Sequence, residues 1–191
     1  ICIYLRREEE AIKTIKRALE LDPFSLIINK NAGDIYLLTR KYDQAIKAYK
    51  KTIEMDPSFG FAHFFLSLAY LEKSMYEMAL AELQKEQNLT IKWLAWADAF
   101  CGVIYAKMGK RSKALLVLDE LVKKVKQANI SPLFPAFVCF ALEMKNQGID
   151  WLEQACNSHD SNLFFMIHHP ILDNVRTDQR FKAIQKKMNL E

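Results

Sequence analysis

Apolar residues recur every three or four positions along most of the chain, which is the period of an amphipathic helix. Between residues 8 and 21 this stripe contains Ala11, Ile15 and Leu19, with lysines and arginines on the other side. Asp22-Pro23 ends the segment, because proline disfavours the helical conformation of the residue before it. The pattern therefore predicts a helix over 8–21, followed by two helices near 25–39 and 42–55.

This arrangement repeats along the chain. Three residue types recur 34 positions apart: Ala11, Ala45 and Ala79; Pro23 and Pro57; Tyr36 and Tyr70. A period of this length predicts a solenoid of helix pairs, in which each pair buries its apolar face only against its neighbours. Tyr105 follows Tyr70 by 35 positions, which indicates a one-residue insertion near residues 88–93.

The repeated unit contains Ala32-Gly33 and Tyr36, then Ala45 and Tyr49, then Pro57. This pattern resembles the tetratricopeptide repeat. The resemblance implies an all-α fold, a right-handed superhelix of helix-turn-helix repeats closed by a helical C-terminal cap. The expected segments are a partial repeat at 1–23, repeats at 24–57, 58–91 and 92–128, a repeat-like unit at 129–160 and a capping segment at 161–191.

The last third of the chain also resembles the terminal repeat and tail of one bacterial group. In that group, tetratricopeptide arrays follow a signalling or transcription domain, in winged-helix regulators, adenylate or guanylate cyclases and Ser/Thr kinases. The matching residues are Ser131-Pro132, Leu142, Trp151-Leu152-Glu153, Ala155, Pro170, Leu172, Arg176, Asp178, Arg180-Phe181 and Met188. Gly148 replaces a usual alanine, so we expect a looser helix pair there, and His169 replaces a usual aspartate.

Composition narrows the setting. The net charge of +4 comes from basic and acidic residues that alternate along the helices, so we expect solvated helix faces and no nucleic-acid partner. No apolar run is long enough to span a bilayer, so we expect no membrane partner. Cys2, Cys101, Cys139 and Cys156 lie in apolar helical contexts, which predicts buried thiols in a reducing, cytoplasmic compartment. The chain opens inside a repeat, so we expect a piece of a longer protein.

Candidate chemistry is sparse. The pair His168-His169 has no acidic residue or cysteine at ligand spacing, which favours a structural turn before Pro170 over a metal site. His63 lies alone on an apolar helix and is expected to pack. The sequence has no glycine-rich elbow, phosphate loop or paired carboxylates. We therefore predict no enzymatic activity, no catalytic residues, no metal and no cofactor.

The strongest candidate for a site is a row of residues at matching positions of the first helices. The family resemblance implies that such positions line the concave groove of the array, and that the middle of this groove is apolar and aromatic. The candidate groove residues are Ile27, Lys30, Asp34, Phe61, Phe64, Leu68, Trp96, Val103, Phe137 and Phe140. Relatives that clamp a carboxylate in this groove need Lys, Asn and Arg at such positions. Phe, Trp and Ala occupy most of them here, so we do not expect this chain to belong to that subfamily. The alternative is that these residues pack against one another, or that an upstream segment fills the groove.

These features predict a non-enzymatic scaffold that binds a peptide or a protein. The bound protein can be another domain of the same chain. The alternative is a regulatory region of a larger bacterial regulator, cyclase or kinase that controls an upstream effector domain. RNA binding would need a continuous basic groove, which these residues do not supply.

Overall fold

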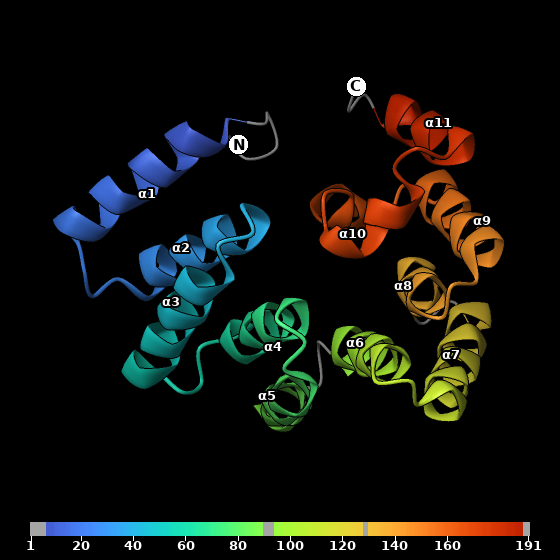
Figure 1. Ribbon diagram of the computed structural model, residues 1–191, viewed down its shortest axis with the longest axis horizontal. Helices are drawn as coiled ribbons and strands as arrows, with labels where there is room; N and C mark the ends of the chain where they lie inside the picture. Colours follow the sequence, from blue (N-terminus) through green and yellow to red (C-terminus); the bar gives the residue numbers. More distant parts are fainter. Residues whose placement is uncertain (1–6, 90–93, 128–129, 189–191) are drawn as a thin grey trace. The chain divides into compact units, whose positions relative to one another are not determined.

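The computed structural model describes residues 7–89, 94–127 and 130–188. In this part of the chain the regular structure is entirely helical, which confirms the predicted all-α fold of paired, repeated helices (Figure 1). The chain forms two compact units, residues 1–91 and 92–191. The predicted start of the first helix pair and the predicted insertion near 88–93 fall partly or wholly outside the described residues.

Unit 1, residues 1–91, consists of helices that pack against their neighbours in sequence. Its described helices are α1 (Glu8–Leu21), α2 (Leu26–Leu38), α3 (Tyr42–Met55), α4 (Ala62–Glu72) and α5 (Tyr76–Leu89). The first helix of each pair packs on its second helix, α2 on α3 and α4 on α5, and α2 also contacts α4. Helices α1 and α3 have the bounds predicted from the sequence, 8–21 and 42–55.

Unit 2, residues 92–191, continues the pairing and adds a tail. Its paired helices are α6 (Leu94–Lys107) with α7 (Arg111–Lys126), and α8 (Leu133–Ala141) with α9 (Lys145–Asn157). The tail consists of α10 (Ser161–Met166), the 3-10 helix η2 (Pro170–Val175) and α11 (Gln179–Lys187). The tail packs on the last pair, because α10 and α11 contact α9 while η2 contacts α8.

The same turn closes the first helix of each of these four pairs. One residue in the turn has a positive φ, and the amide of the next residue donates to a carbonyl five positions back, as in a Schellman motif. The positive-φ residues are Arg40, Ser74, Gly109 and Glu143, and the bonds run from Lys41 to Tyr36, Met75 to Tyr70, Lys110 to Tyr105 and Met144 to Cys139. This turn recurs every 34 or 35 residues, so the repeat also exists in the backbone of unit 2.

The helices of a pair meet at small residues. Ala45, Ala79 and Ala114 are completely buried, as their shared register predicts. A Cβ atom added to Gly33 would lie 2.3 Å from Cε1 of Tyr49, so only glycine allows that ring to pack there. Gly148 has the same role, since a Cβ atom would lie 2.4 Å from Cε1 of Phe140. The expectation that Gly148 loosens its helix pair is therefore wrong.

The tail covers the last helix pair as a packed cap. Phe181 and Ile184 of α11 are buried, and η2 contributes the buried Leu172 and Val175. On the polar side, Arg180 donates from Nε to Glu153 at 2.9 Å and from Nη2 to Asp150 at 2.6 Å, both on α9. The apolar stripe of α11 thus faces the last helix pair.

Candidate interaction surface

In unit 1 the predicted groove positions of α2 are less buried than those of α4: Ile27 is exposed, and Lys30 and Asp34 are half-buried. Ile27 is 60% exposed, although it is an apolar residue. One turn further along, Lys30 donates to Asp34 at 2.6 Å, and the hydroxyl of Tyr49 donates to the same carboxylate at 2.9 Å. Burial raises the pKa of Asp34, while Lys30 and Tyr49 lower it. This face of α2 therefore combines an exposed apolar side chain with a fixed ion pair.

The groove positions of α4 are aromatic and less accessible. Phe64 and Leu68 are buried, whereas Phe61 is half-buried and lies at the start of the helix with a φ of 68°. Phe65 was not among the predicted residues, yet it is central to this cluster. Its ring lies 5.9 Å from Phe61 and 5.9 Å from Tyr49, and the ammonium of Lys30 lies 4.5 Å above it. Since Phe65 contacts the Lys30–Asp34 pair, it joins the candidate faces of α2 and α4.

The start of α4 is held in place by acidic residues of α5. Both oxygens of the buried Glu86 accept backbone amides, from Phe61 at 3.3 Å and Phe64 at 3.2 Å. One turn earlier, Glu82 lies 2.6 Å from Nδ1 of His63. Sequence reasoning expected His63 to pack, which is confirmed, but it missed both glutamates. Their spacing of four residues beside the buried Leu83 was the available signal, because an acidic pair on an inward face needs partners.

In unit 2 the predicted row is largely part of the packing. Trp96 is half-buried and meets Phe134 edge-to-face at 5.0 Å, with Phe137 at 6.4 Å. Phe100 joins this cluster at 5.5 Å from Phe137. Val103, Phe137 and Phe140 are buried. Of the predicted residues in this unit, only Trp96 reaches solvent to an appreciable degree.

His169 has a structural role at the start of η2, and its buried Nε2 atom has no hydrogen-bond partner within the described residues. His169 begins η2, and its Nδ1 accepts the amide of Ile171 at 3.2 Å. Burial lowers the pKa of His169 to about 4, so the ring is neutral at pH 7. Burial also raises the pKa of Cys101 to about 12 and that of Cys139 to about 11, which keeps both thiols protonated and weakly nucleophilic.

The described helices were compared with the requirements of a metal site and of a membrane span. No group of three or more His, Cys, Asp or Glu side chains in this part of the chain is arranged to hold a metal ion. None of the helices in the described ranges is both long enough and apolar enough to cross a membrane.

Comparison with known families agrees with the repeat geometry of unit 1. A family model described as tetratricopeptide repeat matches residues 3–58 and again residues 30–88. The two matches overlap by most of one helix pair, as expected for tandem repeats. Comparison with curated proteins yields no match.

Proposed function

We propose that the chain is a non-enzymatic protein-interaction module, because a tetratricopeptide repeat model matches residues 3–88 and that family is generally non-catalytic. It binds a peptide, a helix or a neighbouring domain against the apolar and aromatic face of its first helices. One observation carries this proposal: Ile27 is 60% exposed at the position where the other first helices place Phe61 and Trp96. Exposed apolar side chains and accessible aromatic rings are typical of interaction surfaces.

The accessible part of this face is smaller than the predicted row. Phe64, Leu68, Val103, Phe137 and Phe140 are buried in the chain itself. In unit 1 a partner would therefore meet Ile27, Lys30, Asp34 and Phe61 directly, while the buried members hold these residues in place. In unit 2 the accessible member of the row is Trp96. Aromatic residues in such positions supply much of the binding energy at protein interfaces.

The test uses variants that leave the fold intact. A partner is recovered by pull-down with the chain, identified, and then titrated against purified variants by calorimetry. Ile27→Ser should weaken binding by about 1–2 kcal/mol, because it removes an apolar contact from the surface. Leu116→Ser is the matched control, since Leu116 is 69% exposed on the second helix α7.

The two variants separate the possible outcomes. Loss of affinity with Ile27→Ser and unchanged affinity with Leu116→Ser support binding on the first helices. The reverse pattern would move the interaction to the second helices and overturn the proposed surface.

We also propose, as a second role, that the chain is the regulatory region of a larger bacterial signalling protein. The resemblance of its last third to the tails of such regulators supports this role. The matching residues Arg176, Asp178 and Arg180 build the cap: Arg176 donates to the carbonyls of residues 167, 168 and 169, and Asp178 caps α11. Sequencing the gene upstream of Ile1 tests the second role, because it requires an effector domain there.

A further inference from the structure

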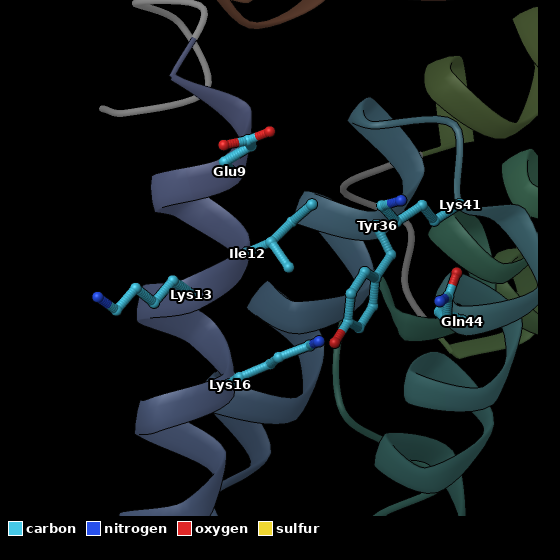
Figure 2. Close-up of a pocket in the computed structure, with 7 residues that line it drawn as sticks. All are labelled: Glu9, Ile12, Lys13, Lys16, Tyr36, Lys41 and Gln44. Atoms are coloured by element: carbon cyan, nitrogen blue, oxygen red, sulfur yellow. The ribbon is translucent and has the colours of Figure 1, made fainter.

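A pocket of ≈ 390 Å³ lies in unit 1, between α1, the end of α2 and the start of α3 (Figure 2). Its size is within the range of about 300–1,000 Å³ that is usual for ligand sites. The lining residues are Glu9, Ile12, Lys13 and Lys16 from α1, Tyr36 from α2, and Lys41 and Gln44 at the start of α3. The site already described uses none of them.

The pocket opens on a different side of α2 from the candidate interaction surface. Tyr36 follows Ile27 by nine residues, which is about two and a half turns at 3.6 residues per turn. The two side chains therefore leave α2 in opposite directions. A ligand in the pocket and a partner over Ile27 would bind independently.

The pocket has an apolar floor and cationic sides. Ile12 and the ring of Tyr36 are half-buried and face each other across the space between α1 and α2 (Figure 2). The side chains of Lys16 and Lys41 extend toward Tyr36, whereas that of Lys13 points away from it (Figure 2). Within the described residues, neither Lys16 nor Lys41 forms an ion pair. Two ammonium groups therefore flank an apolar space with no carboxylate of their own.

Glu9 limits the kind of anion that fits. It precedes Lys16 by seven residues on α1, so it lies about 10 Å away along the helix axis, at 1.5 Å per residue. Its carboxylate would repel a ligand that spreads several negative charges over the pocket. The lining instead matches one negative charge placed near the two lysines, with an apolar body in contact with the floor.

We propose that this pocket binds a monoanionic carboxylate with an aromatic or branched aliphatic body. The carboxylate lies between the ammonium groups of Lys16 and Lys41, which supply charge-assisted hydrogen bonds. The body packs against Ile12 and the face of Tyr36. Such a group is found in a free aromatic acid, and also at the C-terminus of a peptide that ends in an apolar residue.

The first experiment uses 3-phenylpropanoate as the probe and NMR of the isotope-labelled Ile12 methyl groups as the readout. The expected dissociation constant is in the millimolar range, which is usual for a ligand of this size at about 0.3 kcal/mol per heavy atom. The uncharged 3-phenylpropanamide has the same shape and should bind much more weakly. Added salt should weaken the binding of the acid and leave the binding of the amide unchanged.

Charge variants test the placement of the carboxylate. Lys16→Gln and Lys41→Gln should each lower the affinity for the acid about two- to fivefold, as expected for the loss of one partly exposed ion pair. Lys13→Gln is the matched control, because it removes the same charge from the same helix but from a side chain that points away. Glu9→Gln should strengthen binding. All four positions are exposed, so unchanged thermal melts are expected and confirm that the variants fold.

A second probe distinguishes the two sources of the carboxylate. Acetyl-Gly-Gly-Phe with a free C-terminus is compared with the same peptide as its C-terminal amide. Lys16- and Lys41-dependent binding of the peptide acid supports a protein C-terminus as the ligand, and binding of 3-phenylpropanoate alone supports a free acid.

Three results would overturn the proposal. One is that neither acid shifts the Ile12 signals. Another is that the amides bind as well as the acids. The third is that Lys13→Gln weakens binding as much as Lys16→Gln. Ile27→Ser leaves this binding unchanged, so failure here is distinguishable from failure of the interaction surface on the first helices.

Discussion

Helices α2 and α8 are both first helices of a repeat pair, yet they differ in how much of their surface is covered. In α2 the buried positions are Asn29, Ala32, Gly33 and Leu37, and Ile27 is 60% exposed. In α8 every residue from Leu133 to Phe140 is buried. The difference lies in the neighbours: α2 contacts α1, α3 and α4, whereas α8 contacts α6, α7, α9 and the tail helix η2.

The comparison shows that a position within the repeat does not by itself determine exposure. Phe137 was assigned to the groove as the counterpart of Phe61 and Trp96. It lies six residues before the turn residue Glu143, whereas Phe61 and Trp96 lie thirteen residues before Ser74 and Gly109, so this assumed register was wrong. In the last pair, however, additional elements pack around α8, and Phe137 is completely buried. The residues at the position of Phe137 in the other pairs are Asp34, Leu68 and Val103; Asp34 of α2 is half-buried, whereas Leu68, Val103 and Phe137 are core. An interaction surface on the first helices is best supported in unit 1.

The largest predicted effect comes from truncating one candidate groove residue in each of these two helices. Phe137→Ala should destabilise unit 2 by about 3–5 kcal/mol, because it leaves a cavity beside Phe100 and Trp96. Ile27→Ala should change the stability of unit 1 by less than about 0.5 kcal/mol, since its side chain is mostly in water.

Urea unfolding measures both variants. Tryptophan fluorescence follows unit 2 alone, because all three tryptophans of the chain, Trp93, Trp96 and Trp151, lie after residue 91. Far-UV circular dichroism follows unit 1 as well. Similar losses of stability in the two variants would contradict the contrast between α2 and α8.

The next largest predicted effect is a dependence of the stability of unit 2 on pH. His169 packs edge-to-face on Phe100 at 5.7 Å, and the charged groups that act on it are Asp173 and Arg176. Burial is the largest cause of its low pKa, about 4 against 6.5 in water; Asp173 raises the pKa and Arg176 lowers it. Between these pH values the unfolded chain binds a proton that the folded chain does not. Stability is therefore lost as the pH falls from about 6.5 to 4, by up to about 3 kcal/mol.

A single variant isolates this contribution. His169→Asn keeps an acceptor for the amide of Ile171 but does not titrate. The difference in unfolding free energy between the two proteins is measured at pH 7, 5.5 and 4.5 by the tryptophan signal. A difference that stays constant over these three pH values would show that His169 does not titrate differently on unfolding.

Sequence reasoning predicted the paired helices well because two independent signals agree. The 3.6-residue apolar period gives each helix, and the 34-residue recurrence of Ala45 and Ala79 gives the register between helices. Both alanines are completely buried. The turns are also periodic, but Arg40, Ser74 and Glu143 adopt a positive φ that glycine usually supplies. The residue types at these three positions therefore do not by themselves predict a turn with positive φ.

The candidate surface could be predicted only in part, because exposure depends on elements that are distant in sequence. Phe137 contacts Trp96 and Phe100 of α6, and α8 also packs against α7, α9 and η2. No local pattern in the sequence shows that these elements surround α8. Glu86 illustrates the same limit, since its two amide donors are 22 and 25 residues away. Gly148 was misjudged because its packing partner, Phe140, lies on another helix.

The smallest predicted effect tests where the two units should agree. Ala45 in unit 1 and Ala114 in unit 2 are both completely buried in the second helix of a pair. Leucine at either position adds three heavy atoms between two packed helices, so Ala45→Leu and Ala114→Leu should each cost about 1–3 kcal/mol. Ala81→Leu makes the same change at an exposed position of α5 and should cost less than about 0.5 kcal/mol. Circular dichroism in urea measures all three. An unfolding curve unchanged by Ala45→Leu would show that the helices of unit 1 do not meet at this residue. A large loss of stability for Ala114→Leu alone would show that only the helix pairs of unit 2 are tightly packed.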